Sequence, residues 1–179
     1  AGTLEIVTTS HGQLAGVNTS RPNHLVREAI EAGLVPELRG YQQIRSEVLY
    51  GNEKSRVDLL LEDPVLGRCY IEVKNVTLDK GNNLAEFPDS VTSRGAKHLR
   101  ELMVMVAEGH RAVLFFCVQL TGVERAEVEK NIDPVYAETM VQAVAAGVQV
   151  IAWRAALYPE EIILERAISC LQDLPEPVL

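Results

Sequence analysis

An aspartate and a Glu-x-Lys tripeptide stand in two apolar stretches of the chain. Asp58 lies within residues 55–61, and Glu72 and Lys74 lie within residues 69–74. Side chains alternate along a strand, so Glu72 and Lys74 share one face, and pairing of the two strands would bring Asp58 beside them. Carboxylates and an ammonium are costly to bury without partners, and Mg²⁺ prefers oxygen ligands. The pattern predicts metal-assisted phosphodiester hydrolysis, in which Asp58 and Glu72 hold Mg²⁺ (or Mn²⁺) and Lys74 orients or activates water and stabilises charge.

A structural interpretation of the same three residues stands beside the catalytic one. An aspartate on one strand and Glu-x-Lys on the next can form a cross-strand salt bridge on a solvated face. Glu-x-Lys is also a common tripeptide, so alone it carries little specificity. This interpretation predicts an interaction or structural domain that binds no Mg²⁺. The order of the helices and strands around the three residues favours the catalytic interpretation.

Length and composition predict one globular domain. The chain has 179 residues, of which 47% are hydrophobic and 23% are charged, which suffices for a real core. No run of 18 apolar residues predicts a membrane span, and no basic segment followed by an apolar one predicts a signal peptide. No GxxxxGK[ST] phosphate loop occurs, so we expect neither nucleotide hydrolysis nor a small-molecule cofactor. We expect a cytoplasmic protein.

Charge and cysteine content narrow the function further. The formal net charge of -8 argues against a protein that wraps nucleic acid through charge, although a local basic patch is compatible with it. Cys69, Cys117 and Cys170 are odd in number and far apart, which predicts free thiols in a reducing compartment. No Cys or His spacing resembles a zinc site.

Hydrophobic patterns predict alternating strands and helices. A helix is expected at 23–32, capped by Asn23 and ended by Gly33. Residues 77–88 are polar and rich in Gly and Asn, which predicts a mobile loop that contacts substrate. Residues 160–168 suit a helix or a strand, with strand preferred. The remaining expected elements are strands at 3–9, 14–17, 41–50, 55–61, 68–76, 111–119 and 148–155, and helices at 89–108 and 134–146.

This order predicts an α/β fold in which a mixed sheet is flanked by helices. The three strands from 41 to 76 are joined by short turns and should form an antiparallel meander. The strand at 111–119 is apolar throughout and should be central, with both faces buried.

Five motifs accompany these elements: GVNT at 16–19, SEVLYG at 46–51, SRVD at 55–58, YIEVKNVTL at 70–78 and FPDSVTSRGAKHLREL at 87–102. Together the elements and motifs resemble the sugar fermentation stimulation protein (SfsA) family, with a restriction-endonuclease-like PD-(D/E)xK core. The resemblance covers nearly the whole chain.

The family resemblance implies a bacterial or archaeal DNA-binding protein, named as a regulator of sugar catabolism, with the residues of a metal-dependent nuclease. It also implies an OB-like barrel before the nuclease-like domain. Residues 1–17 would then be the end of that barrel and its connector, and residues 18–179 the nuclease-like domain.

Carried over residue by residue, the resemblance makes Asp58 and Glu72 metal ligands and Lys74 the catalytic lysine. Glu28, on the first helix, is a further candidate ligand, and Glu47, on the strand beside Asp58, competes with it. The Pro of the strict motif is replaced by Val57.

Phosphate contacts are expected from basic residues around this site. Lys54 and Arg56 lie at the predicted hairpin, Arg94 and Lys97 on the second long helix, and Arg21 before the first helix. The alternative to a nuclease is a DNA-binding regulator that uses the nuclease fold without cleaving. A homodimer is an open alternative to a monomer.

Overall fold

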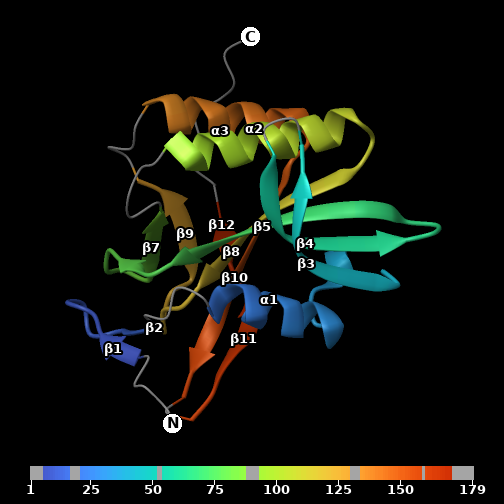
Figure 1. Cartoon of the computed structure of the whole chain (residues 1–179). Helices are drawn as coiled ribbons and strands as arrows, with labels where there is room; N and C mark the ends of the chain where they lie inside the picture. Colours follow the sequence, from blue (N-terminus) through green and yellow to red (C-terminus); the bar gives the residue numbers. More distant parts are fainter. Residues whose placement is uncertain are drawn as a thin grey trace.

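The computed structural model describes residues 6–16, 21–51, 54–87, 93–129, 134–158 and 160–170. A six-stranded sheet in the order β11-β10-β8-β5-β4-β3 forms its centre (Figure 1). Helix α1 (Arg21–Glu31) packs on one face of this sheet, and α2 (Ser93–Ala107) and α3 (Pro134–Ala146) lie side by side on the other. The strands are β3 (Gln43–Tyr50), β4 (Ser55–Asp63), β5 (Gly67–Val76), β8 (Arg111–Val118), β10 (Gln149–Leu157) and β11 (Ile162–Ala167).

The six-stranded sheet is mixed, and the predicted α/β class is confirmed. Strands β3, β4 and β5 form the expected antiparallel meander. Strand β8 runs parallel to both β5 and β10, and β11 returns antiparallel to β10. The ambiguous stretch at 160–168 is therefore a strand at Ile162–Ala167, as preferred.

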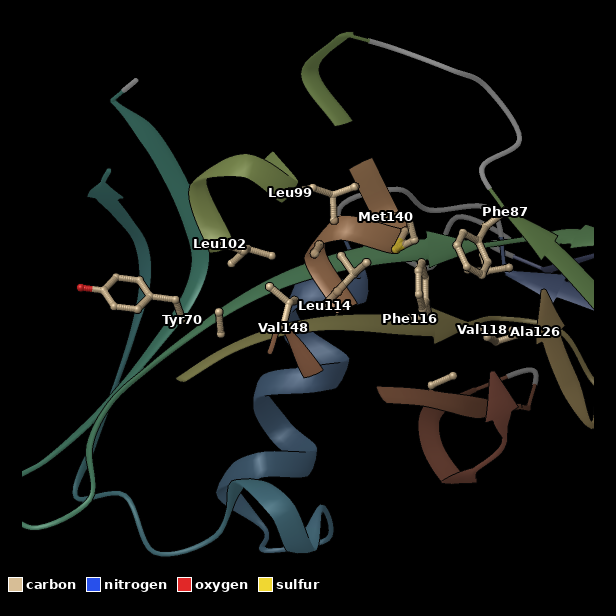
Figure 2. Close-up of a cluster of buried hydrophobic side chains, with 14 of the residues drawn as sticks. Tyr70, Phe87, Leu99, Leu102, Leu114, Phe116, Val118, Ala126, Met140 and Val148 are labelled. Carbon is tan, nitrogen blue, oxygen red and sulfur yellow. The ribbon is translucent and has the colours of Figure 1, made fainter. Parts of the chain in front are cut away.

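Strand β8 is central because nearly all its side chains are apolar. Its two faces are buried in two different cores. Leu114 and Phe116 join the core under α2 and α3, whereas Phe115 and Cys117 join the core under α1. Figure 2 shows Leu99 of α2 and Met140 of α3 in the first of these cores with Leu114 and Phe116.

A four-stranded sheet in the order β12-β9-β7-β6 lies beside the central one. It consists of β6 (Leu78–Asp79), β7 (Leu84–Phe87), β9 (Arg125–Val128) and β12 (Ser169–Cys170). The prediction of a loop throughout 77–88 is wrong, since β6 and β7 fall within it. These strands are too short to show periodicity, and they are fixed by packing: the rings of Phe87 and Phe116 have centroids 3.8 Å apart.

Helix α1 differs from the prediction at its start. It begins at Arg21, so Asn23 lies inside the helix and is not its cap. The expected end at Gly33 is confirmed: Gly33 has a φ of +73°, and the amides of Gly33 and Leu34 donate to the carbonyls of Ile30 and Ala29. A left-handed residue of this kind commonly terminates a helix.

A short hairpin, β1 (Ile6–Thr8) with β2 (Leu14–Gly16), precedes the sheets. The Gly16 amide donates to the carbonyl of Gln119, and the Thr9 hydroxyl donates to the Asp79 carboxylate at 2.6 Å. The assignment of residues 1–17 to the end of a barrel stays a prediction.

The three cysteines are free thiols, as expected: Cys69 and Cys117 are buried and Cys170 is partly exposed. In the part of the chain that the structure describes, none of the helices has the length and apolar character needed to cross a membrane.

Candidate metal centre

The candidate site lies where strands β4 and β5 separate. Their antiparallel ladder ends at the pair Leu59 and Ile71, and the next pair in the same register is Asp58 and Glu72. One Asp58 oxygen, Oδ2, accepts a hydrogen bond of 2.7 Å from the Val73 amide. A side chain thus takes the place of a ladder hydrogen bond and gives the Val73 amide a partner.

A helix residue holds the other oxygen of Asp58. The Asn23 side-chain amide on α1 donates to Oδ1 at 3.0 Å. The start of α1 is thereby fixed to the strand that carries the site. The residue predicted to cap the helix instead orients the Asp58 carboxylate.

Glu72 is buried, with an exposed fraction of 4%. Its Oε1 lies 2.8 Å from His98 Nδ1 and 3.5 Å from Lys74 Nζ. Its Oε2 is buried and has no hydrogen-bond partner among the described residues. The three predicted residues Asp58, Glu72 and Lys74 are therefore brought together around a carboxylate with one unused oxygen.

The electrostatics of the two carboxylates suit a cation. Burial and, to a smaller extent, the negative charge of Glu72 raise the pKa of Asp58 to about 6, against the lowering effect of the hydrogen bonds from Val73 and Asn23. A bound divalent cation would favour the ionised form of both carboxylates. The unused oxygen of Glu72 and the raised pKa of Asp58 fit such a group.

The donor set narrows the kind of cation. Among the described residues, no group of three or more His, Cys, Asp and Glu side chains is arranged to hold a metal ion. Mg²⁺ is commonly bound by one or two carboxylates and keeps several waters. Asp58 and Glu72 meet that requirement, whereas a closed all-protein cage is not formed by the described residues.

Helix α2 contributes two polar residues that the sequence prediction missed. His98 and Glu101 are buried, and their spacing of three puts them on one helix face. A methyl group added at Gly51 would fall on the Glu101 carboxylate, which would have to shift, and the φ of +74° at Gly51 also favours glycine. His98 and Glu101 lie on the same helix stripe as the buried Leu102 and Met105. This pattern is a signal in the sequence that could have identified them.

Two tyrosines extend the polar surroundings of Glu72. The Tyr50 hydroxyl is buried without a hydrogen-bond partner among the described residues. Burial raises the pKa of Tyr50 well above its usual range, and the charges of Glu72 and Glu101 add to the rise. Burial, with a smaller effect of Glu72, raises the pKa of Tyr136 to about 12. Both tyrosines therefore stay neutral hydroxyls beside Glu72.

The two further acidic candidates are placed differently. Glu28 is exposed and lies five residues after Asn23, which is about 140° around the helix axis. Glu47 is also exposed, and its φ of +55° is unusual for a strand residue. Since Ser46 pairs with Leu59 and Val48 with Val57, Glu47 lies in the same row as Asp58. The role of either as a metal ligand stays a prediction.

The predicted phosphate-binding residues lie on elements that border the site. Lys54 and Arg56 are exposed at the turn between β3 and β4, and Lys97 is half-buried on α2 next to His98. Arg56 Nη1 lies 3.4 Å from the Glu47 carbonyl oxygen. Arg21 and Arg94 stand at the starts of α1 and α2, and their side chains are outside the described part of the structure.

The chain is similar to known proteins across the elements that form this site. Residues 20–161 match the family described as sugar fermentation stimulation protein RE domain. A sugar fermentation stimulation protein homolog of Teredinibacter turnerae is 56% identical over 166 residues, which cover 93% of this chain and 70% of that protein. A homolog of Pseudomonas savastanoi pv. phaseolicola is 51% identical over 169 residues, covering 94% and 71%.

A solved structure agrees with the fold. The structure described as Pyrococcus furiosus SfsA in complex with Ca²⁺ superposes with a TM-score of 0.79 at 27% sequence identity. The match covers 92% of this chain and 76% of that one. The two chains therefore share their architecture over nearly all of the present sequence.

Proposed function

Because the chain belongs to the sugar fermentation stimulation protein family, we propose that it binds DNA and hydrolyses phosphodiester bonds with a divalent metal ion. One observation carries the proposal: Asp58 and Glu72 adjoin where β4 and β5 separate, and Glu72 has a buried oxygen without a hydrogen-bond partner among the described residues. Lys74 stands beside them with its side chain 31% exposed. Two acidic groups and an ammonium are the residue types that this chemistry needs.

Each residue has a separate task in this proposal. Asp58 and Glu72 would hold Mg²⁺ or Mn²⁺, which when bound supplies a Lewis acid and lowers the pKa of water. Asn23 and the Val73 amide keep the Asp58 carboxylate in one orientation. The Lys74 ammonium, 3.5 Å from Glu72, reaches solvent and can neutralise a phosphate oxygen as its charge develops.

The proposed divalent metal ion and the proposed DNA substrate rest on different observations. The Pyrococcus furiosus relative is described with Ca²⁺, a hard cation that prefers oxygen ligands, as Mg²⁺ does. DNA as the substrate rests on the family resemblance and on the basic residues around the site. The regulation of sugar catabolism, the cytoplasmic location and a homodimer belong to the same proposal.

A second candidate function is a DNA-binding regulator that holds a metal ion without cleaving. It is favoured by the donor set, since among the described residues no group of three or more His, Cys, Asp and Glu side chains is placed to hold a metal ion. In that case the metal ion would help position a phosphate and Lys74 would contact it. The two functions differ in cleavage, not in metal binding.

The test combines metal binding with cleavage. Mg²⁺ and Mn²⁺ are titrated calorimetrically into the wild-type protein, Asp58→Ala and Lys74→Ala, and plasmid nicking is measured in the same buffers. A nuclease loses metal binding and nicking in Asp58→Ala, whereas Lys74→Ala retains metal and loses nicking.

Two other outcomes would redirect the proposal. Metal binding without nicking in the wild type would favour the non-cleaving regulator. Absence of metal binding in the wild type would remove the site and leave the salt-bridge interpretation.

A further inference from the structure

We propose that His98 is a positioning residue that orients the Glu72 carboxylate for cation binding by donating a hydrogen bond from Nδ1 to Oε1. The inference rests on the metal site of the proposed function, but it does not require that DNA is cleaved. His98 lies on helix α2, which covers the face of the central sheet opposite α1. No motif of the sequence assigned it a role.

The distances fix which group donates. His98 Nδ1 is 2.8 Å from Glu72 Oε1, a full hydrogen bond, and 3.4 Å from Lys74 Nζ. A carboxylate oxygen can only accept and an ammonium can only donate, so a short bond to Oε1 places the proton on Nδ1. Nδ1 therefore cannot accept from Lys74, whose ion pair is with the Glu72 carboxylate.

The bond determines which oxygen of Glu72 remains for a ligand. Oε1 is occupied by the His98 N–H and approached by Lys74, whereas the buried Oε2 has no hydrogen-bond partner among the described residues. An outer group that holds one oxygen of a ligating carboxylate restricts its rotation and leaves the second oxygen in a set direction. His98 would thus prepare Glu72 before a cation arrives.

The imidazole is itself enclosed by packing. His98 is 8% exposed, and its neighbour Leu99 is buried in the core below α2. Figure 2 shows Leu99 and Leu102 of the same helix packed with Leu114. A ring fixed by packing can fix its hydrogen-bond partner in turn.

The same bond limits how closely Lys74 approaches Glu72. The separation of 3.5 Å is long for an N–H···O hydrogen bond, and Oε1 already has a nearer donor. The ammonium therefore keeps donors for a phosphate oxygen and is not consumed in a tight ion pair. Without the imidazole N–H, Lys74 would be expected to close on Oε1.

The test uses three substitutions at one position. His98→Asn can place its Nδ2 where the imidazole Nδ1 lies, His98→Gln cannot, and His98→Leu supplies no donor. Mn²⁺ affinity is measured by calorimetry in the full chain, and unfolding is measured in EDTA for each variant. We expect His98→Leu and His98→Gln to weaken Mn²⁺ binding by about 10- to 100-fold, and His98→Asn to remain within about threefold of wild type.

A control separates positioning from packing. Met105→Ala removes a buried side chain from the same stripe of α2 without touching Glu72. It should destabilise the fold while leaving Mn²⁺ affinity nearly unchanged. Mn²⁺ binding that weakens equally in Met105→Ala, or that fails to be rescued by His98→Asn, would overturn the positioning role.

The failures of the two proposals can be told apart. If Asp58→Ala loses Mn²⁺ binding but His98→Leu retains wild-type affinity, the metal site stands and the role of His98 is overturned. If the wild-type protein binds no Mn²⁺, both are overturned. Loss in Asp58→Ala together with loss in His98→Leu and rescue in His98→Asn supports both.

Discussion

Two buried glutamates in this molecule have opposite surroundings. Glu72 of the central sheet and Glu86 of the small sheet are 4% and 8% exposed, and within the described residues each has an Oε2 atom without a hydrogen bond. Glu72 meets hydrogen-bond donors, His98 and Lys74, at its other oxygen. Glu86 instead pairs in register with Glu127, and the Lys80 ammonium lies at 4.0 Å from it.

The two carboxyl groups differ in what surrounds them. Burial raises the pKa of Glu86, a hydrogen bond with the Glu129 carboxyl and its charge add to the rise, and the Lys80 ammonium opposes it. At Glu72 the donors hold one oxygen, and the second has no hydrogen-bond partner among the described residues, which leaves it available to a cation. Burial of an acid does not by itself predict a metal site; the placement of donors around it does.

The largest expected effect tests the contrast between Glu72 and Glu86 directly. Glu72→Gln should lower Mn²⁺ affinity by at least about 100-fold, because it removes both the charge and one ligand oxygen. The isosteric Glu86→Gln should leave Mn²⁺ affinity unchanged. It should also stabilise the fold at neutral pH by about 0.2–1 kcal/mol, because like charges on paired strands repel.

Calorimetry and chemical denaturation of the two variants check this expectation. The comparison fails if Glu86→Gln weakens Mn²⁺ binding as much as Glu72→Gln does. It also fails if Glu86→Gln destabilises the fold at neutral pH, since the carboxylate would then have a favourable partner.

A second, smaller effect concerns the pH dependence of stability without metal. The pKa of Asp58 is raised from 3.8 to about 6 in the folded state. The folded protein therefore binds this proton more tightly than the unfolded chain, and the Asp58 contribution to stability falls as the pH rises from about 4 to about 6. Fully ionised, the buried carboxylate costs about 3 kcal/mol, from 1.36 kcal/mol for each unit of pKa.

Asp58→Asn isolates that contribution. Between about pH 5 and about pH 7.5 in EDTA, the free energy of unfolding of the wild type should fall by about 1 kcal/mol relative to Asp58→Asn. Saturating Mn²⁺ should restore the wild type at the higher pH and leave the variant unaffected. Parallel pH profiles for the two proteins would show that Asp58 is not perturbed as the structure indicates.

How much of the structure the sequence could predict depends on whether a feature arises from local or from distant contacts. Residues with long, regular patterns were placed correctly: the β3–β4–β5 meander, the apolar β8 and helix α3 from Pro134 all follow from local rules. Asp58, Glu72 and Lys74 were brought together as expected because pairing and alternation fix their faces. These features depend on neighbours in the sequence or on adjacent strands.

What the sequence could not predict depends on contacts between distant elements. His98 reaches Glu72 only because α2 crosses the sheet at that point, and Asn23 meets Asp58 across 35 residues of sequence. The small sheet pairs β7 with β9 and β9 with β12, strands that are far apart in the chain and too short for a pattern. Asn23 fits a capping rule locally, and tertiary contact overrides that rule.

The smallest expected effect shows whether Asn23 or Glu28 is the residue of α1 that supports metal binding. Asn23 donates to Asp58 Oδ1, and this hydrogen bond lowers the Asp58 pKa. Asn23→Ala should raise that pKa and weaken Mn²⁺ binding by about tenfold near neutral pH. Affinity should recover at higher pH, where Asp58 is ionised without help.

Glu28→Ala is the matched control on the same helix, because Glu28 is exposed and turned away from Asn23. It should leave Mn²⁺ affinity unchanged at every pH, as measured by the same calorimetry. A loss of affinity in Glu28→Ala that persists at high pH, with Asn23→Ala unaffected, would instead make Glu28 the ligand and require α1 to rotate or shift when metal binds. Because the two residues lie about 140° apart on the helix, one orientation of α1 cannot present both to the cation.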